Sequence, residues 1–316
     1  MENEIRKKIE VYPVLHKTFL YIEEHSVFYK NIFTASTTIP INLPIAERIC
    51  SDALLMCGGD WVLYTKRLKN LFEINFEFLK LQDFLEKNRR YLYSSFKEVE
   101  ENVFKKERTS ELEGVEYLWG VFFTNVFWVT HHLAFMFFVD EFARKSPRNG
   151  FCLEAPTGSG IFLSNFLDER PEWTAESVDI SQTSRDFATK LHSVKNISDK
   201  VSLVTQDLNI YHTPQKFDRI ISMEFIEHVE DPVSILKKLN ELMADDGKLF
   251  LTTVAWAAFI DHIYLYKSAN EIRAHITEAG FMIEKELVQN IFPKDKGRLN
   301  DSEVALNYSA ILTKQK

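Results

Sequence analysis

Residues 153–160 read Leu-Glu-Ala-Pro-Thr-Gly-Ser-Gly and join a short apolar run to a helical pattern at Ile161–Leu167. Glycine lets the backbone approach a ligand closely, and a helix that begins at such a turn presents unpaired N–H groups to it. A P-loop is excluded because no Lys-Ser/Thr pair follows Gly160, and the Gly-x-Gly-x-x-Gly spacing of an NAD-binding turn is incomplete. On its own, the motif fits either a ligand-binding loop or a plain tight turn between a strand and a helix.

Outward from this turn, strand patterns and helix patterns alternate toward the C-terminus. We predict strands at Phe151–Ala155, Glu176–Ile180, Val201–Thr205, Phe217–Met223, Lys248–Val254, Phe281–Val288 and Glu303–Thr313. Helices are predicted between them at Ile161–Leu167, Thr183–Val194, Pro232–Met243 and Ala269–Ala279. This alternation predicts an α/β fold with a Rossmann-like, seven-stranded, mostly parallel sheet that helices cover on both faces. Because no helix separates the last two strands, they form a hairpin, and one strand is antiparallel.

The first part of the chain is patterned for helices alone, with apolar residues at spacings of three and four. The longest such stretches are Trp61–Lys80 and Glu116–Arg144. Two prolines predict a loop at Ser36–Pro44, and the polar, breaker-rich stretch Lys145–Gly150 marks a boundary. We therefore predict an all-helical domain at residues 1–147, which serves as a substrate-binding lid or a dimerisation surface, and an α/β domain at residues 148–316.

Composition and charge limit the function classes. Hydrophobic residues make up 45% of the 316 residues and charged residues 27%, which is typical of a globular protein with a full apolar core. The formal net charge of −8 disfavours binding to nucleic acid, which needs a basic surface. Three cysteines, Cys50, Cys57 and Cys152, do not resemble a disulfide framework and favour a reducing, cytoplasmic compartment. We expect no secretory signal, because no apolar core follows the charged N-terminus.

One apolar segment is long enough to cross a membrane. Gly120–Val139 holds 20 residues without Asp, Glu, Lys or Arg, and about 20 apolar residues span a bilayer as a helix. The segment also contains two threonines, an asparagine and the adjacent His131 and His132. Polar groups at bilayer depth are costly without partners. We therefore predict a buried helix and no membrane span.

Acidic residues mark the ends of three predicted strands. Glu154 lies at the end of the first strand, Asp179 ends the second strand 25 residues later, and Asp207 follows the third. A carboxylate at the end of the second strand can accept both hydroxyls of a ribose, and Asp207 is placed to receive the amino group of an adenine. A single aspartate after a strand is commonly a solvated turn or a helix cap. Because the carboxyl ends of parallel strands meet at one edge of a sheet, the three together predict a ligand site there.

Residues 151–316 resemble a class I methyltransferase domain and are similar to the small-molecule methyltransferases of the ubiquinone- and menaquinone-biosynthesis type. Besides the loop at 153–160, residues 224–232 read Glu-Phe-Ile-Glu-His-Val-Glu-Asp-Pro, which is similar to the family's Glu-His-Val…Asp-Pro signature. Further matching segments are Leu242–Leu249, His262–Tyr266 and Glu278–Phe281. The resemblance covers about half of the chain, and this combination of motifs is specific.

The resemblance implies S-adenosyl-L-methionine as the cofactor. Glu154 and the glycine loop would hold its amino-acid end, and Asp179 its ribose. Asp207 and Leu208 would hold its adenine. The cofactor-binding residues implied in this way are Glu154, Ala155, Pro156, Thr157, Gly158, Gly160, Asp179, Ile180, Asp207, Leu208, Met223 and Glu224. Pro156 departs from the family pattern, because it stands at the first loop glycine and proline has no N–H to donate.

Methyl transfer is an in-line displacement, in which the enzyme aligns the reacting groups and a nearby base removes the proton of the acceptor. His228, after the fourth strand, and His262, after the fifth, are the candidate bases. Asp261 is placed beside His262 to orient it or to bind a cationic acceptor. For His228 a structural role is the alternative, since relatives without a base role also carry this histidine.

The residues predicted to contact the acceptor are Tyr264, His131, His132 and Trp128. The last three lie in an aromatic helix, which forms either a pocket wall or a buried, domain-docking helix with satisfied histidines. No metal is expected, because adjacent histidines point in different directions on a helix and no third ligand is evident.

The function predicted on this basis is transfer of a methyl group to an O or N atom of a small-molecule acceptor. Two alternatives stay open: a peptide or protein side chain as acceptor, which a long open groove would favour, and a non-catalytic scaffold or sensor. The scaffold alternative does not explain five intact residues of the implied cofactor site: Glu154, Gly158, Gly160, Asp179 and Asp207. The identity of the acceptor and the formation of a homodimer are left open.

Overall fold

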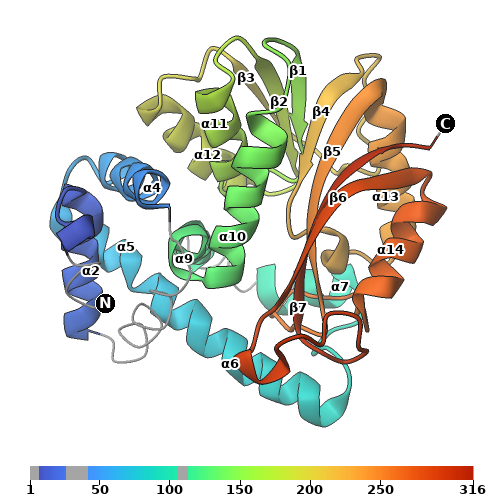
Figure 1. Ribbon diagram of the computed structural model, residues 1–316, viewed down its shortest axis with the longest axis horizontal. Helices are drawn as coiled ribbons and strands as arrows, with labels where there is room; N and C mark the ends of the chain where they lie inside the picture. Colours follow the sequence, from blue (N-terminus) through green and yellow to red (C-terminus); the bar gives the residue numbers. More distant parts are fainter. Residues whose placement is uncertain (1–6, 26–41, 105–112, 316) are drawn as a thin grey trace.

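The C-terminal part of the chain is built on a seven-stranded sheet (Figure 1). The computed structural model describes residues 7–25, 42–104 and 113–315. The strands are β1 (Phe151–Glu154), β2 (Thr174–Asp179), β3 (Val201–Thr205), β4 (Phe217–Ser222), β5 (Met243–Ala255), β6 (Phe281–Asn290) and β7 (Leu306–Lys314). They lie in the order β3-β2-β1-β4-β5-β7-β6, and of these strands only β7 runs antiparallel to its neighbours. The predicted, mostly parallel sheet with one antiparallel strand is confirmed.

Four helices connect these strands, and side chains cap three of them. They are α11 (Ile161–Glu169), α12 (Gln182–Val194), α13 (Pro232–Leu242) and α14 (Ala269–Glu278). Ser181, Asp231 and Ser268 each accept a backbone N–H from the first turn of α12, α13 and α14 respectively. Such caps satisfy donors that have no partner inside the helix. Helices α13 and α14 cover one face of the sheet, and α11 and α12 cover the other (Figure 1).

The N-terminal part is helical, but in shorter pieces than predicted. Its helices are α2 (Pro13–His25), α4 (Leu43–Met56), α5 (Trp61–Leu68), α6 (Asn70–Asn88), α7 (Phe96–Val99), α9 (Glu113–Phe127) and α10 (Val129–Phe137), with π-helical turns at Glu100–Phe104 and Phe138–Ala143. The predicted stretch Trp61–Lys80 is divided at Lys69 into α5 and α6. Of the predicted loop, residues 36–41 lie outside the described part of the chain. Pro44 belongs to α4 instead, because proline fits the first turn of a helix.

The second long stretch, Glu116–Arg144, is not one helix, and that prediction is wrong. Helices α9 and α10 meet at Trp128, where the backbone is extended (φ −98°, ψ 123°). Among the described residues no single helix has the length and apolar character to cross a membrane. Taken together, α9 and α10 have the length and composition of a membrane span, but the pair is bent by 76°. Helix α9 packs on α6 and α12, whereas α10 packs on β6 and β7. The bend lets each half bury its apolar face against a different partner.

Two histidines hold this bend. Nδ1 of His131 lies 2.9 Å from Oγ1 of Thr124. Nδ1 of His132 lies 3.0 Å from the carbonyl oxygen of Asn125, while its Nε2 accepts the backbone N–H of Asn42 at 3.0 Å. Nδ1 of His132 therefore carries the ring proton. Burial lowers the pKa of both rings, that of His131 to about 4, so both are neutral at physiological pH and serve as hydrogen-bonding groups of the bend.

Phenylalanine rings join the N-terminal helices to the sheet. Phe138, in the turn after α10, is fully buried. Its ring lies against Phe162 of α11 and Phe250 of β5, with centroids 5.1 and 5.0 Å apart. Edge-to-face pairs of this kind add to the gain from apolar burial. The apolar core is therefore continuous across residues 147–148, where the sequence predicts a domain boundary.

The substitution Phe138→Ala should lower the free energy of unfolding by about 3–5 kcal/mol, because it removes a fully buried ring and leaves a cavity. Urea unfolding followed by circular dichroism measures the change. Phe76, whose side chain is 72% exposed, provides the control, and Phe76→Ala should change the free energy by less than about 0.5 kcal/mol. Equal losses for the two variants would show that Phe138 does not join the two parts.

Candidate active site

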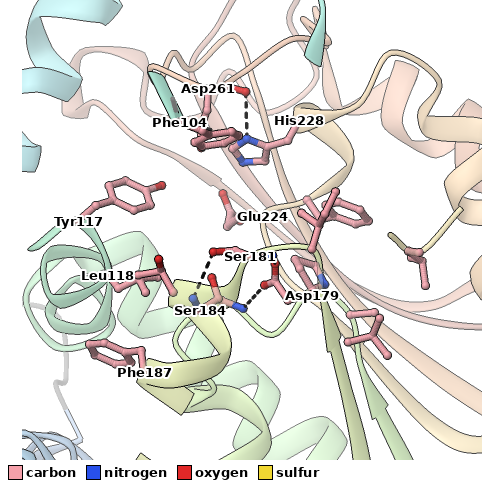
Figure 2. A pocket seen from close by; sticks show the side chains of 18 of the residues that line it. Phe104, Tyr117, Leu118, Asp179, Ser181, Ser184, Phe187, Glu224, His228 and Asp261 are labelled. Atoms are coloured by element: carbon pink, nitrogen blue, oxygen red, sulfur yellow. Dashed lines mark hydrogen bonds and ion pairs between the residues drawn. The ribbon is translucent and has the colours of Figure 1, made fainter. Parts of the chain in front are cut away.

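A cavity of about 1260 Å³ lies at the carboxyl edge of the sheet, between the strand ends and the N-terminal helices (Figure 2). Ligands of open parallel sheets bind at this edge. Ten of the predicted site residues line it: Ala155, Pro156, Gly158, Asp179, Ile180, Asp207, Leu208, Glu224, His228 and Asp261. They follow or end β1, β2, β3, β4 and β5. The sheet topology therefore brings residues together that are up to 106 positions apart in the chain.

Asp179 ties two strand ends together. Its Oδ2 accepts the backbone N–H of Gly158 at 2.9 Å, and its Oδ1 accepts that of Ser181 at 2.8 Å. The loop after β1 and the loop after β2 are thereby held in a fixed relation. Burial raises the pKa of Asp179, while these N–H donors act in the opposite direction. Asp179 also lines the cavity, so a ligand there would lie next to its carboxyl group.

The two loop glycines meet different requirements. Gly158 has a φ of +51°, which other residues rarely adopt, and a Cβ there would meet no atom within 4 Å. The loop is therefore open on that side. Gly160 has a φ of +70°, and a Cβ there would lie 2.9 Å from the Cβ of Ala188 in α12. Gly160 does not line the cavity; it allows α12 to pack closely against the loop.

Glu154 lies beneath the loop and is not among the residues that line the cavity. Its side chain is only 2% exposed. Oε1 accepts the backbone N–H of Leu163 in α11 at 3.0 Å, and Oε2 accepts the hydroxyl of Ser177 in β2 at 2.8 Å. Burial raises the pKa of Glu154 to about 8. The predicted direct contact with a ligand does not fit this geometry, in which the carboxyl group holds α11 and β2 under the loop.

Glu224, His228 and Asp261 lie together at another side of the cavity (Figure 2). Nδ1 of His228 is 3.1 Å from the carbonyl oxygen of Asp261 and 3.5 Å from its Oδ1. Because a carbonyl oxygen only accepts, this nitrogen carries the ring proton and Nε2 keeps a lone pair. The backbone N–H of Glu224 donates to Oγ1 of Thr252 at 3.0 Å. This side of the cavity thus combines a basic nitrogen with two carboxyl groups.

His262 lies behind His228 and does not line the cavity. It is 7% exposed, its Nδ1 is 2.9 Å from the carbonyl oxygen of Ala257, and its ring meets that of His228 edge-on with centroids 4.9 Å apart. Burial lowers the pKa of His262 well below its ordinary value. The predicted role of His262 as a base in contact with a substrate does not fit this position.

Six other predicted site residues also lie outside the cavity lining: Thr157, Met223, Trp128, His131, His132 and Tyr264. The hydroxyl of Tyr264 donates to Oε1 of Glu271 at 3.2 Å. The ring of Trp128 packs on that of Phe78 with centroids 5.5 Å apart, and the two histidines are engaged at the bend between α9 and α10. Sequence spacing predicts the helix or strand to which a residue belongs. It does not predict the direction of the side chain, and these side chains contact neighbouring residues instead of the cavity.

A mainly aromatic wall from the helices lines one side of the cavity, and its members were not predicted as site residues. Tyr117, Leu118 and Trp119 come from α9, and Phe187 comes from α12. The ring of Trp119 meets that of Phe187 edge-on, with centroids 5.0 Å apart. Figure 2 shows Tyr117, Leu118 and Phe187 along one side of the cavity. The apolar period of α9 predicts that it is buried, but it carries no signal for which residues face a ligand.

Residues 131–286 match the family model described as a methyltransferase domain. Among curated proteins, the chain is 39% identical over 62 residues to (S)-coclaurine N-methyltransferase of Papaver somniferum, which covers 20% of this chain and 18% of that protein. It is 42% identical over 52 residues to the ubiquinone biosynthesis O-methyltransferase of Haemophilus ducreyi. This match covers 16% of this chain and 22% of that protein. The chain thus spans less than half of the length of these curated relatives.

Similar solved structures include mitomycin 7-O-methyltransferase, which is 12% identical with a TM-score of 0.49 over 74% of this chain and 67% of that chain. Another is the N-methyltransferase NodS of Bradyrhizobium japonicum WM9, solved in complex with S-adenosyl-L-homocysteine. It is 15% identical, with a TM-score of 0.43 over 59% of this chain and 88% of that chain.

The substitution Glu154→Gln should weaken the pH dependence of stability. Because the pKa of Glu154 rises from 4.5 to about 8 on folding, the folded protein retains a proton that the unfolded chain releases between these values. Wild-type stability should therefore fall as pH rises from about 4.5 to 8. Glutamine has no such proton, so the fall should be smaller by roughly 1–4 kcal/mol.

Urea unfolding at about pH 5 and about pH 8, both within this range, measures the difference. The exposed Glu172 supplies the control, and Glu172→Gln should keep the wild-type response. If Glu154→Gln loses as much stability as the wild type between the two conditions, Glu154 does not hold a proton in the folded protein.

Proposed function

We propose that this chain, of which residues 131–286 match the family model of a methyltransferase domain, is a class I methyltransferase that uses S-adenosyl-L-methionine to methylate an O or N atom of a small-molecule acceptor. One observation carries the proposal: the glycine loop and two acidic residues, Asp179 and Asp207, line one cavity at the carboxyl edge of the sheet. These are the positions at which the family resemblance implies cofactor contacts.

The residues present fit this cofactor. The open side of Gly158 leaves room for its amino-acid end, and Asp179, which lines the cavity, is placed to accept ribose hydroxyls. Asp207 and Leu208, beside them in the lining, would hold the adenine. When bound, the cofactor supplies a methyl group on a positively charged sulfur, which suits a cavity that also contains the carboxyl group of Glu224. Glu154 would act as a positioning residue, through α11 and β2.

The cavity is large enough to hold an acceptor beside the cofactor. A cavity for one drug-sized ligand typically measures about 300–1,000 Å³, whereas this one measures about 1260 Å³. Its aromatic wall, with Tyr117, Trp119 and Phe187, favours a flat or aromatic acceptor. His228 faces the same cavity with a lone pair on Nε2, so it could take a hydrogen bond from an acceptor hydroxyl or amine. The name of one curated relative gives the small molecule (S)-coclaurine as its acceptor, and the name of the other places it in ubiquinone biosynthesis.

The cofactor site is tested by isothermal titration calorimetry with S-adenosyl-L-homocysteine. The wild type should bind, and Asp179→Ala should bind at least about tenfold more weakly, because hydrogen bonds to a charged group contribute about 1.5–3 kcal/mol. Asp199, which is exposed and outside the cavity, provides the control, and Asp199→Ala should bind as the wild type does. Absence of binding to the folded wild type would contradict the cofactor assignment.

The acceptor side is tested by incubating the protein with S-adenosyl-L-methionine and a panel of phenols, amines and short peptides. Mass spectrometry should detect a phenol or amine product that is one methyl group heavier. For that acceptor, Tyr117→Ala should raise KM while leaving the binding of S-adenosyl-L-homocysteine unchanged, since Tyr117 belongs to the aromatic wall. Methylation of the peptides alone would contradict the small-molecule acceptor. Cofactor binding without any product would favour the non-catalytic alternative.

A further inference from the structure

We propose that Glu227, His228 and His262 form a binding site for a divalent cation of the zinc type, at the edge of the cavity. One possible ligand atom from each of the three side chains lies within 4.8 Å of the other two. Two imidazoles and one carboxylate are the donor set of many catalytic zinc and other transition-metal sites. The sequence does not predict a metal, because 34 positions separate His228 from His262.

The backbone holds these three residues in place. Glu227 and His228 belong to a short 3-10 turn after β4, Ile226–His228. The carbonyl oxygen of Glu227 accepts two N–H groups directly after His262, those of Ile263 at 2.8 Å and Tyr264 at 2.9 Å. The turn and the loop after β5 are thereby joined beside the proposed ligands, so the cluster does not depend on long, mobile side chains.

The carboxyl group of Glu227 supplies a second, independent observation. Its side chain is fully buried, and Oε2 accepts the hydroxyl of Thr253 at 2.7 Å. Oε1 is buried as well; no N–H or hydroxyl group in the described part of the chain donates to it, and a hydrogen bond with the carboxyl group of Glu224 requires one of the two acids to carry a proton. A buried polar atom without a partner is costly. A cation between this oxygen and the two imidazoles would satisfy it.

Both histidines are oriented as metal ligands commonly are. Nδ1 of His228 lies 3.1 Å from the carbonyl oxygen of Asp261, and Nδ1 of His262 lies 2.9 Å from that of Ala257. Because carbonyl oxygens only accept, each Nδ1 carries the proton and each Nε2 keeps its lone pair. A ligating histidine almost always donates its other ring N–H to such a partner, which fixes its tautomer and orientation.

The position of the cluster indicates what a bound cation would contact. Glu227 and His262 are buried, whereas His228 lines the cavity. The protein would therefore supply ligands from one side and leave a coordination position open toward the cavity, as in catalytic sites. With bonds of about 2.0–2.2 Å, the ligand atoms must approach one another by rotation of the side chains. If the proposed function holds, a cation there would lower the pKa of an acceptor hydroxyl, which favours an oxygen acceptor.

The test uses the full chain, stripped with a chelator and titrated with Co²⁺, whose visible absorption reports coordination by protein ligands. The wild type should bind about one equivalent, which Zn²⁺ displaces. Glu227→Gln keeps the size of the side chain but removes its charge, and His228→Ala changes a partly exposed residue. Both should bind Co²⁺ at least about tenfold more weakly. The control is His212→Ala, at an exposed position outside the cluster, and it should bind as the wild type does.

The proposal is overturned if the folded wild type shows no saturable Co²⁺ absorption, or if Glu227→Gln and His228→Ala bind as tightly as His212→Ala. Circular dichroism shows which variants are folded, and either of the two ligand variants is sufficient for the comparison. Titration of the same samples with S-adenosyl-L-homocysteine separates the two proposals. Cation binding without cofactor binding would support the cation site and contradict the proposed function. Cofactor binding without cation binding would contradict only the cation site.

Discussion

The two hydrogen bonds that Asp179 accepts from Gly158 and Ser181 fix the glycine loop at the carboxyl edge of the sheet, the side of the cavity proposed to bind the cofactor. They join the loop after β1 to the loop after β2, through the N–H groups of Gly158 and Ser181. Glu154 holds the same loop from below, through α11 and β2. A glycine at position 160 is required for α12 to approach the loop. The hydrogen bonds of Asp179 and Glu154 involve buried carboxyl groups, so losing one partner leaves the other unsatisfied in a water-poor environment.

The N-terminal helices complete the site because they pack on the same core as the sheet. The bend at Trp128 sends α10 across β6 and β7 and leaves α9 beside α6 and α12. As a result, one continuous aromatic cluster both supports the sheet and supplies the wall of the cavity. A movement of α9 would therefore change the cavity and the core together, which links the shape of the acceptor side to the stability of the protein.

Beside His228, at another side of the cavity from the glycine loop, lie two acidic residues with desolvated carboxyl groups, Glu224 and Glu227. Burial raises the pKa of Glu227 well above its ordinary value, and the charge of Glu224 raises it further. Two carboxyl groups this close and this far from water favour either a proton or a cation between them and their neighbours. Burial lowers the pKa of His262 well below its ordinary value, so this imidazole adds no positive charge beside Glu227. A proton shared by the two carboxyl groups, or the proposed cation, would satisfy this side of the cavity.

The sequence by itself determined the α/β alternation, the antiparallel end of the sheet and the strand ends at which Asp179 and Asp207 stand. It could do so because strand and helix periods are local, and because parallel strands place their carboxyl ends at one edge. Only the tertiary structure decided that Glu154 faces the core, that α9 and α10 part at Trp128, and that Glu227 meets His262. Those outcomes depend on the direction of side chains and on contacts between residues far apart in the chain, which no periodicity along the sequence encodes.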